Sequence, residues 1–319
     1  MKLSSSTAIN NLAVPVTYYH PRPEDLIRFM AGLGFKIFDF GFTEDMVKAH
    51  LGGASPEARF GGFRKTLAEL GASCGQAHSC VPDALIKDDW APLQKWVAAE
   101  LDICKYLDIP RMVVHPGMMP GNTKDEFFDK NRDWYRSLMP LAEKWGVEIM
   151  TENIGSHGDI YYFVRDGREL RELVDHVDHP LFCACWDAGH ANHHKQFCQY
   201  ESIIALGDKL KALHIQDNFG SFGILEPHGW KPDIHQIPFF GHTNWDSVMQ
   251  GLLDIGYKGT FNFEVLFPRL THVDRRHFIY QGKEADKLSR PSLRMVELAA
   301  ELMYETGKYI LGAYNCFEA

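Results

Sequence analysis

The sequence predicts a single (β/α)8 barrel, and three observations support this fold class. Short apolar runs rich in β-branched residues alternate with longer stretches of helical periodicity, which is the pattern of a parallel sheet with helical connections. Eight such runs occur, and eight repeats fit a closed barrel better than an open doubly wound sheet. The 319 residues contain no linker or low-complexity tract, so we expect one domain over residues 1–319.

The eight apolar runs define the strands that we expect, in chain order. They are 12–17, 36–40, 73–78, 111–115, 147–152, 181–187, 211–216 and 260–265. Helical spacing of apolar residues predicts helices at 24–31, 56–70, 90–107, 124–145, 168–177 and 245–255. Gly146 is a stop signal after the fourth of these helices. Thr243 lies three residues before Asp246, which resembles a capping box at the start of the last one.

Two segments are too long to be ordinary connections. Residues 218–244 separate the seventh strand from the next helix, and a loop of more than about 12–15 residues in a compact domain usually has a function or is mobile. Residues 283–319 predict a final helix followed by a tail.

Composition limits the classes of function. The net charge of −9 (33 basic against 42 acidic residues) argues against a protein whose main role is to bind nucleic-acid phosphates. No apolar run of about 18 residues predicts a membrane span, and the first residues lack the apolar core of a signal peptide. Seven cysteines in a long chain fit reduced thiols. We therefore expect a cytoplasmic protein with a small-molecule partner, and leave homo-oligomer formation open.

Six predicted strands carry a His, Asp or Glu at or near their carboxyl ends. In a parallel barrel these ends meet on one face, where barrel enzymes place their active sites. The six residues are His78, His115, Glu152, Asp187, His214 and Glu264. Six residues of metal-binding type on six separate strands indicate a functional site at this face.

Side-chain alternation along a strand predicts what lies below these residues. If Asp187 points into the barrel, Ala184 and Trp186 face the helices. The residues then expected inside the barrel are Cys183, Cys185, Ala212 and Asn262. We interpret the two cysteines as packing residues, because free Cys often behaves as a small buried hydrophobe.

Mixed carboxylate and imidazole ligands predict a divalent metal such as Zn²⁺, Mn²⁺ or Fe²⁺ rather than Ca²⁺. Three carboxylates at one end of a barrel would otherwise repel one another, and a divalent cation removes that conflict. The ligands that we expect are Glu152, Asp187, His214 and Glu264.

A second group of residues is expected to bind substrate oxygens or further metal ions. It consists of His78, His115, His190, Asp233 and His235. We expect His193 and His194 to be solvated instead. The sequence lacks a phosphate-binding P-loop and the Gly-x-Ser-x-Gly turn of serine hydrolases.

The chain resembles the xylose-isomerase-like barrel superfamily from its fourth strand to its eighth. That group includes sugar-phosphate isomerases and epimerases, ketose 3-epimerases, hydroxypyruvate isomerase and endonuclease IV. The matching stretches are Val-Val-His115-Pro-Gly, Thr-Glu152-Asn-Ile-Gly, Cys-Trp-Asp187-Ala-Gly-His190-Ala-Asn, Leu-His214-Ile-Gln-Asp-Asn, Asp233-Ile-His235 with Gly241-His-Thr-Asn-Trp245, and Gly-Thr-Phe-Asn-Phe-Glu264-Val.

The resemblance implies one of two metal arrangements. In the epimerases, Glu, Asp, His and Glu on strands five to eight hold one metal, a pattern that carries over to Glu152, Asp187, His214 and Glu264. The endonuclease uses nine ligands around three zinc ions. The residues that match it are His78, His115, Glu152, Asp187, His190, His214, Asp233, His235 and Glu264.

These residues favour a metal-dependent isomerase or epimerase acting on a sugar or sugar phosphate. The metal would polarise the carbonyl and stabilise an enediolate, while Glu152 and Glu264 would exchange the proton on the adjacent carbon. The alternatives are an endonuclease IV-like zinc phosphodiesterase, a metal-dependent dehydratase or lyase on a sugar derivative, and a sugar-binding module without activity.

Overall fold

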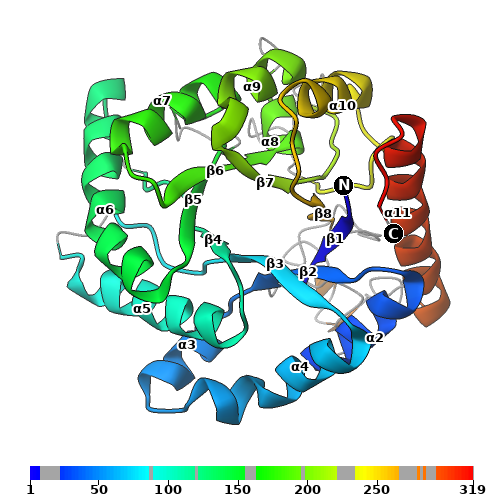
Figure 1. The fold of residues 1–319 in the computed structure, drawn as a ribbon, viewed down its shortest axis with the longest axis horizontal. Coiled ribbons are helices and arrows are strands. Elements are labelled where there is room, and N and C mark those ends of the chain that lie inside the picture. Colours follow the sequence, from blue (N-terminus) through cyan, green and yellow to red (C-terminus); the bar gives the residue numbers. More distant parts are fainter. Residues whose placement is uncertain are drawn as a thin grey trace.

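The computed structural model describes residues 1–7, 22–85, 89–118, 121–154, 163–194, 198–220, 234–265 and 292–318, and two short strands at 279–280 and 283–284. Eight parallel strands lie in the order β7-β6-β5-β4-β3-β2-β1-β8 and are surrounded by helices (Figure 1). A parallel bridge between Ile215 and Phe263 joins the two end strands, and Ile215 N–H donates to the Asn262 carbonyl at 2.8 Å. The predicted (β/α)8 barrel is confirmed.

Seven of the eight predicted strands overlap the strands of the barrel. The observed strands are β1 (Leu3–Ser6), β2 (Ile37–Gly41), β3 (Ser73–His78), β4 (Arg111–Val113), β5 (Glu148–Glu152), β6 (Phe182–Asp187), β7 (Leu210–His214) and β8 (Phe261–Phe263). The prediction of the first strand was wrong. Residues 12–17 lie outside the described residues, and the first barrel strand is the serine-rich β1, in which Ser4 and Ser5 are buried.

Helices cover the outside of the barrel. They are α2 (Pro23–Leu33), α3 (Glu44–Leu51), α4 (Pro56–Leu70), α5 (Ala91–Tyr106), α6 (Lys124–Trp145), α7 (Gly167–Val177), α8 (Ala188–Asn192), α9 (Gln199–Leu206), α10 (Trp245–Asp254) and α11 (Leu293–Ala313), with a 3-10 turn at Gly207–Lys209. Helical spacing in the sequence did not predict α3, α8 or α9. Within the described ranges, none of the helices has the length and apolar character needed to cross a membrane.

Helix ends follow local chemistry. Gly146 ends α6 in the left-handed conformation, at φ 66°, as expected for a stop signal. The capping box predicted at Thr243 was wrong. The side chain that caps α10 is Asn244, whose oxygen accepts from Ser247 N–H at 3.0 Å. An Asn one residue closer to the helix presents its oxygen to the free N–H groups of the first turn.

The C-terminal segment returns to the first strand. α11 lies beside β1 and α2 (Figure 1), and Glu318 N–H donates to the Met1 carbonyl at 3.0 Å. Before α11, β9 (Ile279–Tyr280) pairs antiparallel with β10 (Lys283–Glu284), so the expected final helix begins at Leu293 rather than near residue 283. The single-domain assignment stays a prediction.

The barrel interior has two chemically different halves. β4 to β7 contribute what we call the apolar half, consisting of Val113, Met150, Cys183, Cys185 and Ala212. β8 and β1 to β3 contribute the polar half, consisting of Ser4, Asp39, Gln76 and Asn262, all buried. The inward direction predicted for the two cysteines and Ala212 is confirmed, and Ala184 and Trp186 pack outward in the main core.

Candidate metal centre

The six residues expected at the carboxyl ends of the strands occupy that end of the barrel. His78, Glu152, Asp187 and His214 are the last residues of β3, β5, β6 and β7. Glu264 directly follows β8, and His115 lies two residues beyond β4. Because the strands are parallel, these positions face one another across the barrel mouth.

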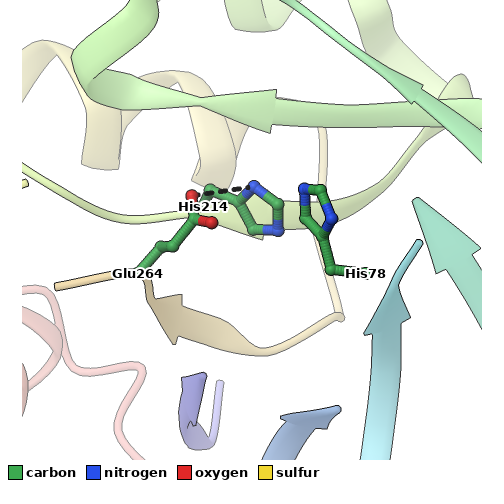
Figure 2. A group of neighbouring side chains, drawn as sticks. All are labelled: His78, His214 and Glu264. Carbon is green, nitrogen blue, oxygen red and sulfur yellow. Dashed lines mark ion pairs between the residues drawn. The ribbon is translucent and has the colours of Figure 1, made fainter. Parts of the chain in front are cut away.

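Four of these residues form one compact group, which we call the ligand cluster. It consists of Glu152, Asp187, His214 and Glu264, and one ligand atom from each lies within 4.8 Å of all the others. His214 Nδ1 lies 3.0 Å from Glu152 Oε1 and 3.2 Å from Glu264 Oε2 (Figure 2). The side chains of Glu152, Asp187 and His214 are buried, whereas that of Glu264 is 17% exposed, so the cluster opens toward solvent beside Glu264.

Local hydrogen bonds fix the direction of Asp187. Its Oδ1 accepts from His190 N–H at 2.6 Å and from Gln216 Nε2 at 3.2 Å, because Asp187 caps the N-terminus of α8. The Asn153 amide donates to the Asp187 carbonyl and accepts from its N–H, at 2.9 and 2.8 Å. A Cβ at position 189 would overlap the Gln216 amide, so Gly189 leaves room for that side chain to reach Asp187.

The atoms that face the centre of the cluster suit a cation. Glu152 Oε1 and Oε2, Asp187 Oδ2 and His214 Nδ1 are buried and have no hydrogen-bond partner among the described residues. Leaving buried polar atoms unsatisfied costs about 1–3 kcal/mol each, and more for charged groups. A divalent cation bound by these atoms would remove that cost, so the residues present fit a metal ion.

The pKa shifts in the ligand cluster reflect the crowding of buried carboxylates around one imidazole. Burial raises the pKa of Asp187 to about 7, opposed by His190 and reinforced by Glu152 and Glu264. Burial acts on Glu152 in the same direction, but His214, His115 and His190 outweigh it and hold the pKa of Glu152 well below its ordinary value. Burial would lower the pKa of His214, yet Cys185, Glu152 and Glu264 raise it well above its ordinary value. A bound cation would replace these protons as the source of positive charge.

Cys185 lies close enough to Glu152 and His214 to be counted with them as a metal-capable group. Burial raises the pKa of its thiol to about 12. Cys185 also packs with the other residues of the apolar half, which is the packing role expected from the sequence.

Histidines form a second layer on the open side of the cluster. His78 Nε2 and His115 Nε2 are 3.0 Å apart, and Glu152 Oε2 lies 3.3 Å from His115 and 3.7 Å from His78. Figure 2 shows the His78 ring facing the His214 ring, with centroids 5.5 Å apart. His78, His115 and Glu152 make a second metal-capable group.

The other two described histidines of this layer lie beside Glu152, Asp187 and Glu264. His190 Nδ1 is 2.9 Å from the Asn153 carbonyl and 3.2 Å from Glu152 Oε1. His235 Nδ1 is 2.8 Å from the Glu264 carbonyl. Asp233, the fifth residue expected in this layer, lies outside the described residues.

The expectation for His193 and His194 was wrong. Their exposed fractions are 2% and 8%, so neither is solvated. The short α8 begins directly after Asp187, which keeps its last turn against the barrel instead of at the surface.

Two buried carboxylates were missed. Asp39 lies in β2, with Oδ2 3.4 Å from His214 Nε2. Side-chain alternation in the run Ile-Phe-Asp-Phe-Gly at 37–41 was the signal that could have shown it. Asp217 accepts from the N–H groups of Asn218, Phe239 and Thr243 and from Trp245 Nε1. It thereby anchors the segment that contains His235, and nothing in the local sequence indicates these partners.

The fold and this cluster define a parallel barrel with metal-capable residues at the carboxyl ends of its strands. The chain belongs to the xylose isomerase-like TIM barrel family, whose sequence profile matches residues 27–295. It is 28% identical over 143 residues to a probable endonuclease 4 of Thermotoga maritima, a match that covers 41% of this chain and 49% of that protein. The chain thus spans about half the length of the curated relatives it matches.

Solved structures show the same fold over almost the whole chain. A D-psicose 3-epimerase from Clostridium cellulolyticum H10 superimposes with a TM-score of 0.69 at 17% identity, over 98% of this chain and 99% of that one. The IOLI protein, solved with a bound zinc atom, gives a TM-score of 0.68 at 18% identity over 100% of both chains. At these identities the likeness shows the fold alone.

Proposed function

We propose that the protein is a divalent-metal-dependent isomerase or epimerase that moves a proton on the carbon beside the carbonyl of a sugar or sugar phosphate. The observation that carries this proposal is the ligand cluster, in which three carboxylates and one imidazole from four neighbouring strands converge within 4.8 Å. The ketose 3-epimerase neighbours support it, because they share the fold across nearly their whole length.

Glu152, Asp187, His214 and Glu264 would hold the cation. Mixed oxygen and nitrogen donors suit Zn²⁺ or Mn²⁺, and the zinc atom in the IOLI structure supports the first of these. When bound, such a cation acts as a Lewis acid that polarises a carbonyl oxygen.

Glu152 and Glu264 would carry the proton. Their carboxylate oxygens lie 3.0 and 3.2 Å from the same nitrogen of His214. A substrate carbon bound beside that nitrogen would lie between the two carboxylates. One removes the proton from the carbon beside the carbonyl, and the other returns it. Proton transfer by a positioned side chain contributes about 10²–10⁴-fold to a rate.

The histidine layer would bind the hydroxyl groups of the substrate. The side chain of His115 is half exposed, and those of His78 and His235 are 17% and 13% exposed. These rings therefore line the side from which a substrate enters. Imidazole nitrogens can both donate to and accept from hydroxyls, which suits a polyhydroxylated ligand.

Deuterium exchange tests the proposal. The protein supplied with Zn²⁺ or Mn²⁺ is incubated in D₂O with a panel of ketoses and ketose phosphates, and NMR follows deuterium at the carbon beside the carbonyl. We expect incorporation, reduced about 10²–10⁴-fold by Glu264→Gln. Glu148→Gln is the matched control, because Glu148 lies at the other end of β5 and pairs with Arg111 at 3.0 Å. Absence of exchange across the whole panel would contradict the proposal.

One observation favours a second candidate function, a zinc phosphodiesterase that cleaves DNA at abasic sites. His78, His115 and Glu152 form the additional metal-capable group, and the curated relatives include probable endonuclease 4 proteins. Elemental analysis separates the two functions: three zinc ions per chain, with cleavage of a duplex that contains an abasic site, favours the phosphodiesterase. One metal ion per chain without cleavage favours the isomerase.

A further inference from the structure

His214 connects the two halves of the barrel interior. Its Nδ1 faces Glu152 and Glu264 of the ligand cluster at 3.0 and 3.2 Å. Its Nε2 faces the other way, and Asp39 Oδ2 lies 3.4 Å from it. The side chains of His214 and Asp39 are 0% and 1% exposed, so bulk water does not compete for either ring nitrogen.

The polar half holds Asp39 in place from two directions. Its Oδ2 accepts from Gln76 Nε2 of β3 and from Asn262 Nδ2 of β8, both at 3.0 Å. Because the Asp39 carboxylate can only accept, it faces the Asn262 amide nitrogen, and the Asn262 oxygen points away from Asp39 and accepts from the Ser4 hydroxyl of β1 at 2.7 Å. Gln76 of β3 and Asn262 of β8 thus orient the Asp39 carboxylate of β2 toward His214.

This arrangement has a chemical consequence for His214. A neutral imidazole carries one hydrogen, and the group that accepts it determines which nitrogen has a free lone pair. Glu152 and Glu264 lie nearer, at Nδ1, but a bound cation would occupy their oxygens. The Asp39 carboxylate beside Nε2 would then hold the hydrogen on Nε2 and leave the Nδ1 lone pair directed at the cluster. Carboxylate partners of this kind fix the orientation and raise the basicity of metal-binding histidines.

We propose that Asp39 is a positioning residue, which holds His214 with its hydrogen on Nε2 and its Nδ1 lone pair directed at the ligand cluster. The inference rests on the proposed metal-dependent function. It adds a fifth strand, β2, to the four strands that supply the ligands, and assigns a role to the polar half of the barrel interior.

The test is Zn²⁺ affinity, measured on the full chain by competition with a chromophoric chelator. We expect Asp39→Ala to weaken Zn²⁺ binding about 10- to 100-fold, the usual effect of removing such a partner. Asp39→Asn should lose less, because its carbonyl oxygen still accepts a hydrogen bond but carries no charge. NMR of labelled histidines in the Zn²⁺ complex should show the Nε2 hydrogen of His214 shifted downfield by its carboxylate partner in the wild type, and shifted back upfield in Asp39→Ala.

Ser4→Ala is the matched control. It removes a buried hydrogen bond of the same network without touching Asp39 or His214, so it should lower stability while Zn²⁺ affinity stays within twofold of the wild type. Equal affinities of the wild type and both Asp39 variants would overturn the inference, and so would an equal loss in Ser4→Ala. If Asp39→Ala does not fold, Asp39→Asn and its NMR spectrum decide. A wild type that binds no Zn²⁺ or Mn²⁺ would instead overturn the proposed function, and the inference with it.

Discussion

The two halves of the barrel interior are filled by side chains of different chemistry. The apolar half, from β4 to β7, fills the interior with one Val, one Met, one Ala and two Cys. The polar half, from β8 to β3, fills it with one Ser, one Asp, one Gln and one Asn that bond to one another. Both halves lie below the same ligand cluster, so the contrast shows which kind of support each ligand receives.

The apolar half supports the cluster by excluding water. Cys185 lies beneath Asp187 and Ala212 beneath His214 on the same strands, and both side chains are buried. The polar half supports the ligand cluster by orienting one ligand, because Asp39 contacts His214 from below. Packing thus buries the ligands, and hydrogen bonding orients the one that is an imidazole.

The largest effect should come from a cavity in the apolar half. Met150 is fully buried there, and Met150→Ala should lower the free energy of unfolding by about 2–5 kcal/mol. Met150→Leu, which conserves volume, should cost less than about 1.5 kcal/mol. Urea unfolding followed by circular dichroism measures both. A cost for Met150→Ala below that of Met150→Leu would show that this half does not depend on close packing.

A second prediction concerns the loop that follows the polar half. Glu100 of α5 is buried, and its carboxylate accepts from the Ser79 hydroxyl at 2.5 Å and from Cys80 N–H at 2.9 Å, just beyond the end of β3. Burial raises the pKa of Glu100 from 4.5 to about 7, although these donors and Trp96 oppose the shift. The folded protein therefore binds this proton more tightly than the unfolded chain does.

The sign of the pH dependence follows from that difference. The contribution of Glu100 to stability is fully present below about pH 4.5 and is lost as the pH rises toward 7, by about 3 kcal/mol in total for a pKa change from 4.5 to about 7. Urea unfolding at a series of pH values measures this slope, and Glu100→Gln should flatten it between pH 5 and 7. An unchanged slope in the variant would assign the pH dependence to other groups.

The same contrast explains what the sequence could predict. Glu152 and Asp187 end runs of apolar residues, so alternation and the parallel topology placed them together at the barrel mouth. β1 was missed because its inward residues are serines: Ser4 bonds to Asn262 at 2.7 Å, and a hydrophobic pattern cannot detect a strand whose inner side is polar.

Partners that are distant in sequence account for the rest. Asp39 contacts Gln76, His214 and Asn262, which are 37 to 223 positions away, and a buried Asp in an apolar run does not reveal these contacts. The burial of His193 and His194 likewise depends on where α8 lies against the barrel. Local patterns thus predicted the elements and the positions of the candidate ligands, while the hydrogen-bond network beneath them required the folded chain.

The smallest effect should come from the hydrogen bonds of the polar half. Asn262→Ala removes one donor to Asp39 and the acceptor of the Ser4 hydroxyl. Asp39 keeps its bond from Gln76, so the one group left without its partner is the Ser4 hydroxyl. That loss costs about 1–3 kcal/mol, less than the cavity of Met150→Ala because the removed side chain contributes little apolar area. Urea unfolding of Asn262→Ala beside Ser4→Ala, which breaks only the bond between Ser4 and Asn262, separates the two contributions. If Asn262→Ala destabilised the barrel more than Met150→Ala, hydrogen bonding rather than packing would be the main support of its interior, and the contrast between the halves would be reversed.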